Sequence, residues 1–583
     1  MPVDDERRPL LAESDNVSKS NQEASDIPSN LSRTRVCIIL AATWVAIFLG
    51  ALDTTIVSTL VSPISSSFAS ANQASWLGTS FLLAIATTTP LYGKLSDIIG
   101  RRPSALIALT LFAIGTLLCG LAQSMPMLIA ARALAGCGGG GIMTIATTIA
   151  SDIIPLRRRG LVQGFANICY GLGQGLGGPL GGMIVGRFHW RWAFLVQVPA
   201  LVLAWILIFI FVRYSLPGQA RTMKSAFKQI DWLGSAALIL CISGLLLSLS
   251  FRNNQVDRLL PASMMKCQLY TVKNLPWSDP KVWATMTTFV VFLVAFVTVE
   301  AFVCPNPVMP LRILSSRSTI CIAMSNFLLS MINYIVLYYL PILYETVQLS
   351  SPQQAGIHLI PNAIALSSGS LLSGLIMRLT GKYYYLNILS AAAPLIGAIT
   401  MANMDQIPRW TDWIVCVPNG IGIGSNVTVL LIALLANVDR EDMAVATGIS
   451  YLFRYCGQVV GVGVAGSVMQ SILTSQLRAR ITGPGSGRLI DQIRLVPSSI
   501  SDLAPDIRET AVDSYHVALR WVFAINGGLA CLNTIVSLFI EENMLPGTLD
   551  SQQKLQDDRK SSRRRNDLST PPDVQNSHVP DEQ

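Results

Sequence analysis

The segment GKLSDIIGRR, from Gly93 to Arg102, is the most informative part of the sequence about the fold, because its pattern returns in the second half of the chain. The later stretch is GLIMRLTGKY, from Gly374 to Tyr383, and each of the two joins one apolar segment to the next. Three positions correspond at an offset of 281 residues: Gly93 with Gly374, Gly100 with Gly381, and Arg101 with Lys382.

A second match supports an internal repeat. Because the two matches are collinear and have nearly the same offset, we infer a duplication with a small insertion; the alternative is coincidence, since glycine is common in membrane helices. The predicted fold is an all-α polytopic membrane protein with two six-helix halves, and parallel repeats of this kind are known in transporters. At an offset of 284 residues, Gly164, Gly173, Gln174, Gly177 and Gly182 correspond to Gly448, Gly457, Gln458, Gly461 and Gly466.

The composition is that of a membrane protein. Of the 583 residues, 51% are apolar and only 13% are charged, whereas soluble proteins carry about 25% charged residues. The net charge of +8 does not indicate a nucleic-acid partner, because the basic residues lie in short runs between apolar segments. The eleven cysteines have no paired spacing, so neither a disulfide framework nor a metal site is expected.

Fourteen apolar stretches meet the length of about 20 residues that a membrane-crossing helix needs. The first six and the last six belong to the two halves, and the seventh and eighth are inserted between them; the open point is whether 231–303 holds one span or two. The predicted spans are 36–61, 74–92, 104–122, 127–150, 161–185, 192–213, 231–250, 282–303, 318–343, 355–377, 384–402, 412–436, 443–472 and 516–540.

The basic residues predict the orientation. With a cytosolic N-terminus, ten basic residues of the first half lie in cytosolic loops against only Arg187 and Arg191 on the opposite side, which agrees with the positive-inside rule. Both termini are then cytosolic. The ten are Lys94, Arg101, Arg102, Arg157, Arg158, Arg159, Arg213, Arg221, Lys224 and Lys228.

The spans also divide the chain into five regions. Residues 1–32 are predicted to be a disordered tail, 33–213 the N-terminal half, 214–317 the central linker with two helices, 318–540 the C-terminal half and 541–583 a second disordered tail.

The loop sequence GKLSDIIGRR resembles the signature of the major facilitator superfamily at every defining position. The resemblance implies a gating role for Gly93, Asp97, Gly100, Arg101 and Arg102. Gly93 is expected to let the second and eleventh spans approach closely. Asp97 and Arg101 are expected to form a charge cluster near a helix terminus at the membrane edge, which favours the outward-open state; the alternative is a solvated basic loop.

Further motifs are similar to those of fourteen-helix drug/proton antiporters. They are LDTTIVSTLVSPI from Leu52, RALAGCGGGG from Arg132, and WRWAFLVQVP from Trp190. GGPLGG from Gly177 matches the antiporter motif of the fifth span, in which small residues allow tight helix packing and a proline bends the helix; dense packing alone is the alternative role. The motif residues are Gly178, Pro179, Gly181 and Gly182.

Within that superfamily the chain resembles fungal vacuolar basic amino acid transporters, on the stretches RALAGCGGGGIMTIATTIASDIIPLRRRG, PWSDPKVW and ATGISYLFRYCGQVVGV. The subfamily also includes multidrug-resistance pumps. The resemblance therefore implies a proton-coupled antiporter of a small-molecule substrate, either basic amino acids moved into the vacuole or drugs expelled at the plasma membrane. A monomer without a cofactor is expected.

Three charged residues qualify as candidates within the membrane: Asp53 deep in the first span, Arg132 early in the fourth and Arg454 about eleven residues into the thirteenth. A charge at mid-bilayer costs about 2.5–3.5 kcal/mol on insertion scales, so each is a functional candidate. We expect Asp53 to change protonation as the cavity opens to either side, with Arg132 assisting proton transfer. Arg454, which corresponds to Tyr170 in the repeat, is a candidate to hold a substrate carboxylate or to pair with an acid. The alternative for all three is a buried structural salt bridge.

Other function classes are disfavoured by the sequence. It contains no Walker-type phosphate-binding loop, and its four histidines are scattered, so an enzyme is not expected. A transporter-like nutrient receptor that signals without transport remains an alternative.

The N-terminal tail contains ERRPLL, in which Glu6, Leu10 and Leu11 resemble an acidic dileucine sorting signal read by an adaptor. A stretch from Val256 to Lys273 is either a lumenal insertion or a translated intron.

Overall fold

The computed structural model describes most of the chain between its two ends. The described residues are 32–68, 76–213, 231–254, 256–258, 270–272, 280–303, 311–314, 316–350, 352–404, 409–439, 442–482, 486–495, 500, 503–543 and 545. Most of the two predicted tails, including the sorting residues Glu6, Leu10 and Leu11, lies outside them.

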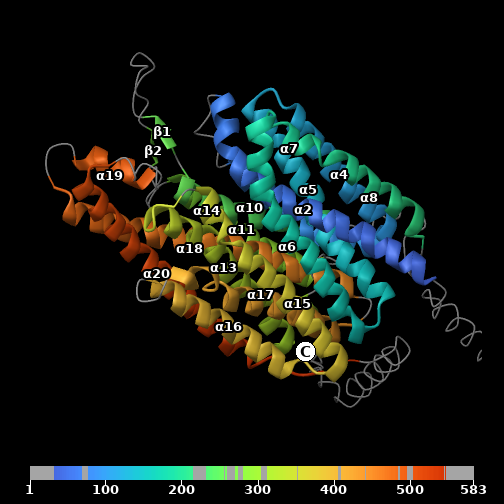
Figure 1. Cartoon of the computed structure of the whole chain (residues 1–583). Helices are drawn as coiled ribbons and strands as arrows, with labels where there is room; N and C mark the ends of the chain where they lie inside the picture. The colour runs from blue at the N-terminus through green and yellow to red at the C-terminus, as the bar shows by residue number, and fades with distance from the viewer. Residues whose placement is uncertain are drawn as a thin grey trace, which may run out of the picture.

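The N-terminal half is a bundle of long helices (Figure 1). Each helix ends where polar residues, glycine or proline interrupt an apolar segment. At the start of α5, for example, the Ser124 hydroxyl accepts a hydrogen bond from the Met127 amide and Pro126 occupies the first turn, as is usual for a helix N-terminus. The helices are α2 (Arg33–Ser67), α3 (Trp76–Ile99), α4 (Arg101–Leu121), α5 (Met125–Ile153), α6 (Leu156–Arg187), α7 (Trp192–Leu195) and α8 (Val198–Phe211).

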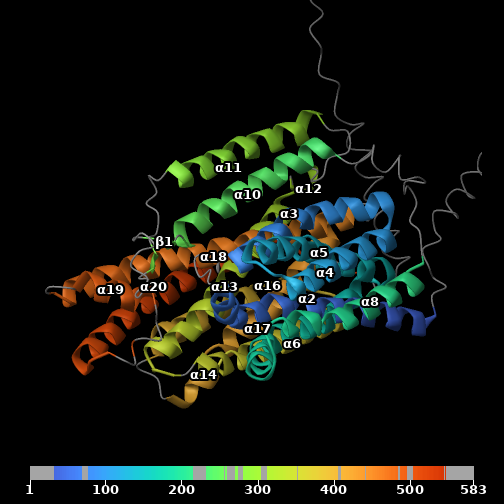
Figure 2. The ribbon, with the colours of Figure 1, turned by 90° about the horizontal axis from the view of Figure 1, so that it is seen from above.

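The inserted region holds two separate helices, which lie side by side at one edge of the molecule, and the first of them contacts α3 and α18 (Figure 2). They are α10 (Trp232–Asn254) and α11 (Pro280–Thr298), the latter continued by the π-helix η2 (Val299–Val303). Between them β1 (Val256–Arg258) pairs antiparallel with β2 (Tyr270–Val272), so the ends of the stretch Val256–Lys273 meet in a short ladder. The short helix α12 (Leu311–Leu314) precedes the second half.

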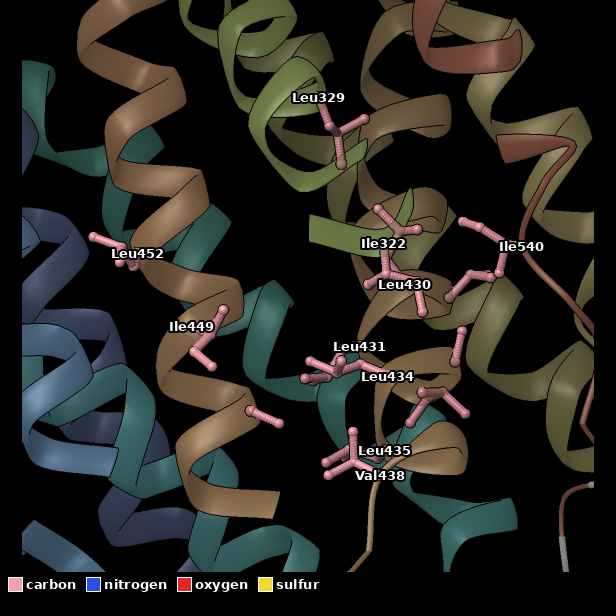
Figure 3. Packing of buried hydrophobic residues seen from close by; sticks show 14 of the residues in the cluster. Ile322, Leu329, Leu430, Leu431, Leu434, Leu435, Val438, Ile449, Leu452 and Ile540 are labelled. Atoms are coloured by element: carbon pink, nitrogen blue, oxygen red, sulfur yellow. The ribbon is translucent and has the colours of Figure 1, made fainter. Parts of the chain in front are cut away.

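The C-terminal half is a second bundle. Its core surrounds α17, where Leu430, Leu431 and Leu434 face Ile449 of α18 and Ile322 of α13 (Figure 3). The elements are α13 (Arg317–Thr346), α14 (Pro352–Ile357), α15 (Ile360–Thr380), α16 (Tyr384–Ala402), the 3-10 helix η4 (Arg409–Trp413), α17 (Val417–Asn437), α18 (Met443–Arg480), α19 (Ser486–Leu495) and α20 (Pro505–Ser537).

Eleven helical stretches of the described chain are long and apolar enough to cross a membrane. The helices α3, α6 and α10 are 24, 32 and 23 residues long, which exceeds the length required, but they are not among the eleven. The protein is therefore a polytopic helical membrane protein, and the count of fourteen spans stays a prediction.

Packing within the two halves follows one pattern. Contacts of α2 with α6, α3 with α5 and α4 with α5 correspond to contacts of α13 with α18, α15 with α17 and α16 with α17. The loop glycines are also equivalent: Gly100 and Gly381, matched in the sequence, are the two glycines with positive φ in the described chain, at 95° and 72°. L-residues rarely adopt this conformation, so glycine serves both chain reversals.

The matched glycines of α6 and α18 make equivalent close contacts. A Cβ added to Gly173 would lie 2.4 Å from the Phe48 carbonyl oxygen of α2, and one added to Gly457 would lie 2.2 Å from the Phe327 carbonyl oxygen of α13. Small residues at such positions let membrane helices approach backbone to backbone. The equivalence of these contacts supports the duplication.

Ordered contacts continue past residue 540, which was the predicted end of the second half. The hydroxyl of Tyr383 donates to the Glu541 carbonyl and accepts from the Asn543 amide, while the Glu542 carboxylate accepts from the Tyr383 amide. Burial raises the pKa of Tyr383, so its hydroxyl stays protonated at neutral pH. The residues 541–543, which follow α20, are therefore hydrogen-bonded to Tyr383 at the start of α16.

Candidate functional site

A buried ion pair joins two of the predicted charged residues. Arg132 Nη1 donates to Asp53 Oδ2 at 2.5 Å, which links α5 to α2, and the exposed fractions of the two side chains are 1% and 0%. Arg132 Nε also donates to the Leu77 carbonyl, and its guanidinium lies 4.0 Å from the centroid of the Phe81 ring. The sequence analysis singles out the two charges as separate candidates, and in the structure they form an ion pair.

The carboxylate of Asp53 keeps one oxygen without a partner. Within the described chain, Asp53 Oδ1 is buried and makes no hydrogen bond. An unpaired buried oxygen is costly to leave unsatisfied. The pair thus combines a carboxylate oxygen without a hydrogen-bond partner in the described chain with a buried positive charge.

A cavity lies beside this pair, between the two halves of the molecule. The space in this cavity that is not filled by atoms, which includes space open to solvent, is about 430 Å³. Phe81 lines the cavity and its ring also lies against Arg132, so one residue adjoins both the cavity and the ion pair. The lining residues are Ile47, Gly50, Ala51, Thr54, Phe81, Leu82, Ile85, Gly139, Ile142, Met143 and Tyr170 from the first half, and Tyr334, Tyr455 and Gln458 from the second.

The third predicted charge, Arg454, lies next to this cavity. Its Nε donates to Asn326 Oδ1 at 2.8 Å, and its Nη2 donates to the Val427 carbonyl at 3.2 Å. Tyr170, Tyr451 and Tyr455 surround the guanidinium. No carboxylate of the described chain forms an ion pair with Arg454, so of the two predicted roles, pairing with an acid finds no partner there.

The loop signature forms a compact charge cluster. Arg101 Nη1 lies 2.5 Å from Asp97 Oδ1 and 3.0 Å from Ser96 Oγ, and Arg101 Nε lies 2.9 Å from Asp152 Oδ2 at the end of α5. Arg101 is 3% exposed and Asp152 is 7% exposed. The cluster is therefore a buried junction of α3, α4 and α5 and not a solvated loop. Arg102 lies outside it and stacks on the Phe209 ring of α8 at 4.4 Å.

The helix that Gly93 approaches is not the predicted one. A Cβ at Gly93 would lie 2.7 Å from the Ala444 carbonyl oxygen of α18, which is the predicted thirteenth span. The expectation of a close contact with the eleventh span, α16, is wrong. The two inserted helices raise the number of every later span by two. The repeat therefore makes the thirteenth span, α18, the counterpart of the fifth span, α6.

The two halves are joined on one side of the membrane. This side, which we call the basic side, carries the α3–α4 loop around Gly100 and the α5–α6 junction with Arg157. Arg157 donates hydrogen bonds to the carbonyls of Arg378 and Leu379, and backbones of α6 and α15 touch at Gly160 and Gly374.

Deeper contacts on the basic side are hydrogen bonds between side chains. The hydroxyls of Thr147 and Tyr451 are 2.9 Å apart. Asn167 of α6 donates to Ser370 of α15 and Thr428 of α17 at 2.8 and 3.2 Å. These bonds join the two halves through side chains that are buried inside the bundle.

The opposite end of α6 lacks such contacts. A Cβ at Gly182 would meet no atom within 4 Å in the described chain, and the nearby Met183 is 57% exposed. Gly182 and Pro179 are exposed, while Gly181 is buried and Gly178 half-buried. Helix α6 continues through Pro179, and the tight contacts with α2 come from Gly173 and Gly177. A Cβ at Gly164 would lie 2.9 Å from the Leu371 Cα of α15, whereas one at Gly175 would lie 3.8 Å from the Ala363 Cβ, so in the described chain α6 and α15 pack most closely toward the basic side.

Several residues of this site are absent from the sequence-based candidates. Asp152 is the second carboxylate of the loop cluster, and Asn167 and Tyr451 carry contacts between the halves. Asp152 comes shortly after an apolar span, as Asp97 does. This shared position could have identified Asp152 from the sequence. The cavity tyrosines gave no signal, because tyrosines are common in membrane helices.

Comparisons with known proteins agree with this architecture. The family model for the Major Facilitator Superfamily matches residues 43–462. The chain is 36% identical over 547 residues to "Multidrug resistance protein fnx1" of Schizosaccharomyces pombe, covering 92% of this chain and 99% of that protein. It is 30% identical over 542 residues to "Vacuolar membrane amino acid uptake transporter fnx2" of the same organism, covering 92% and 90%.

Among solved structures, the proton:xylose symporter XylE bound to 6-bromo-6-deoxy-D-glucose superposes with a TM-score of 0.55. The superposition covers 90% of this chain and 100% of that chain at 14% identity, a likeness that concerns the fold alone.

Proposed function

Because this chain belongs to the major facilitator superfamily and is a membrane transporter, we propose that it is a proton-coupled antiporter that moves small molecules out of the cytosol. The observation that carries the proposal is the buried pair of Asp53 and Arg132 beside a cavity between the halves. A charge pair inside a membrane bundle is costly unless it has a function or a partner, and this one adjoins the transport path.

Proton binding at Asp53 gives the pair two states. In the ion pair, the Asp53 carboxylate balances the charge of Arg132. Protonation of Asp53 removes that balance, and an uncompensated buried charge is strongly unfavourable. Arg132 must then gain another partner or water, so protonation favours a rearrangement of α2 against α5. A proton arriving from one side is in this way coupled to the opening of the cavity.

The loop cluster is the second part of the proposed mechanism. Arg101 ties Asp97 and Asp152 together while Gly93 holds α3 against α18 on the basic side. We assign this cluster as a latch of the state in which the basic side is closed. The excess of basic residues in these loops makes the basic side cytosolic, and the closed basic side then corresponds to a cavity facing away from the cytosol.

Two substrate classes remain candidates, each supported by one relative. Basic amino acids moved into the vacuole are favoured by the similarity to the vacuolar amino acid transporter. Drug efflux at the plasma membrane is favoured by the similarity to the multidrug resistance protein. The segment with Glu6, Leu10 and Leu11, as a signal for a cytosolic sorting adaptor, favours the vacuolar membrane.

The proposed function is tested with purified protein in proteoliposomes that carry an imposed pH gradient. Labelled L-lysine and a fluorescent cationic drug are offered on the side opposite to the acidic lumen, and their accumulation is followed as the gradient is collapsed with a protonophore. Gradient-dependent accumulation of either solute supports antiport and excludes a receptor that signals without transport. Equal accumulation with and without the gradient contradicts proton coupling.

A further inference from the structure

The cavity between the halves has a chemical character that narrows the substrate. Its lining comes from α2, α3, α5 and α6 on one side and from α13 and α18 on the other. In transporters built from two repeats, the substrate binds near the bilayer midplane at the repeat interface. The cavity is thus the place in the described chain where a substrate would contact both halves.

The lining is aromatic and apolar and contains no acidic side chain. Tyr170, Tyr334, Tyr455 and Phe81 supply the rings, and Gln458 and Thr54 supply polar groups. The nearby carboxylate of Asp53 is fully buried and already bound to Arg132. A cationic group entering the cavity would therefore meet no free carboxylate among the described lining residues.

Arg454 places a positive charge beside the cavity, whose described lining has no free carboxylate. It lies one helical turn before Gln458 on α18, and residues four apart share one face of a helix, so it is on the cavity side. Two of its nitrogens bind neutral oxygens, those of Asn326 and Val427, and its Nη1 makes no hydrogen bond in the described chain. Arg454 as a whole is 8% exposed. A buried arginine without a counterion is unfavourable, and a carboxylate is its preferred partner.

The tyrosines connect this charge to the cavity. Tyr170 and Tyr455 line the cavity and also flank the Arg454 guanidinium. A ligand that lies on the rings of Tyr170, Tyr334 and Tyr455 therefore has its end next to Arg454. Aromatic rings provide a large apolar contact, and their hydroxyls can bind a polar end group.

We propose that the substrate carries a carboxylate bound by Arg454 and an apolar or aromatic body packed among Tyr170, Tyr334, Tyr455 and Phe81. The inference rests on the proposed function in that this cavity is the transport site. Of the substrate classes considered above, it narrows the amino acids to those with apolar side chains, adds organic acids, and argues against basic amino acids and cationic drugs as the preferred substrates. A second positive charge close to Arg454, without a free carboxylate beside it, would be repelled.

The test measures equilibrium binding without a pH gradient, so its result is independent of proton coupling. The full-length protein in lipid nanodiscs is titrated by calorimetry with 3-phenylpropionate and with 3-phenylpropylamine, which share a body and differ in the charged end. L-Phenylalanine and L-lysine form a second pair. Failure of antiport with intact carboxylate binding would contradict the proposed function alone.

The expected result is that 3-phenylpropionate and L-phenylalanine bind at least about tenfold more tightly than 3-phenylpropylamine and L-lysine. Arg454→Gln removes the preference, and Arg454→Lys, which keeps the charge, weakens it. Arg480→Gln is the matched control, because it makes the same change on the same helix in an exposed ion pair with Asp513. The proposal is overturned if neither carboxylate probe binds, if an amine or lysine binds equally well, or if the preference survives in Arg454→Gln. Even if an Arg454 variant fails to fold, the relative affinities of the wild-type protein for the carboxylate probes and for 3-phenylpropylamine and L-lysine test the proposal.

Discussion

The guanidinium of Arg132 and the carboxylate of Asp53 lie 2.5 Å apart although 79 residues separate them in the chain. Neither side chain is more than 1% exposed. The contact depends on the packing of α2 against α5, and Phe81, whose ring lies against Arg132, also lines the cavity. The ion pair therefore joins two helices next to the cavity wall.

The first prediction concerns the stability of this pair. Asp53→Ala leaves Arg132 buried without a counterion, and breaking a buried pair in this way costs about 3–5 kcal/mol. Removal of both charges in Asp53→Asn/Arg132→Gln should recover most of that loss, because no unpaired charge is left. Thermal unfolding of the two variants in the same detergent measures the difference. Equal destabilisation by the single and the double variant would show that the pair is not coupled.

The second prediction concerns the loop cluster. Asp97→Ala removes a charged hydrogen bond to Arg101, and such bonds contribute about 1.5–3 kcal/mol. If the cluster stabilises the state closed on the basic side, the variant populates that state at least about tenfold less, and turnover falls while expression stays near normal. Asp513→Ala, which removes an exposed ion pair with Arg480, is the control. Unchanged turnover in Asp97→Ala, or a loss that merely follows a loss of protein, counts against the latch.

The third prediction concerns the contact of α3 with α18. A methyl group at Gly93 would collide with the Ala444 carbonyl oxygen, whereas a Cβ at Gly78, in the same helix, meets no described atom within 4 Å. Gly93→Ala should therefore separate the halves on the basic side, and Gly78→Ala should not. Spin labels at the exposed positions Arg158 and Lys382 report the distance between the halves by pulsed electron resonance. An identical distance distribution in wild type and Gly93→Ala would exclude the role assigned to Gly93.

The fourth prediction concerns location. Leu10 and Leu11 lie in a polar N-terminal stretch, where two adjacent leucines suit the apolar pocket of an adaptor. Replacement of both by alanine should move a fluorescent fusion from the vacuolar membrane to the cell surface. If wild type and variant both stay at the plasma membrane, the vacuolar assignment is wrong and drug efflux becomes the better account.

The sequence predicted those features that depend on local pattern. Sequence spacing was enough to predict the repeat, the glycine pairs and the cluster of Asp97 with Arg101. Each of these features depends on a particular residue type at a particular position in the sequence. The contact of Arg132 with Asp53 could not be predicted, since it depends on which helices lie side by side. The same limit explains why Gly93 was assigned to the wrong helix and why Asp152 was missed.

The cavity was the least predictable feature. Tyr170, Tyr334 and Tyr455 are far apart in the chain and carry no charge, so no pattern distinguishes them from tyrosines that only fill space between helices. Arg454 was recognised because a charge within an apolar span is costly. Its surroundings, which decide what it binds, come from four different helices.

Proton coupling at Asp53 is tested most directly by Asp53→Asn in proteoliposomes with an imposed pH gradient. One pH unit supplies about 1.4 kcal/mol per proton, so two units sustain about hundredfold accumulation with one proton exchanged per solute. Asparagine keeps the size and a hydrogen-bond acceptor for Arg132 but cannot take up a proton. We predict that the variant inserts into the membrane, still exchanges labelled for unlabelled solute at zero gradient, and loses gradient-driven accumulation. Accumulation at the wild-type level in Asp53→Asn would contradict proton coupling at this residue.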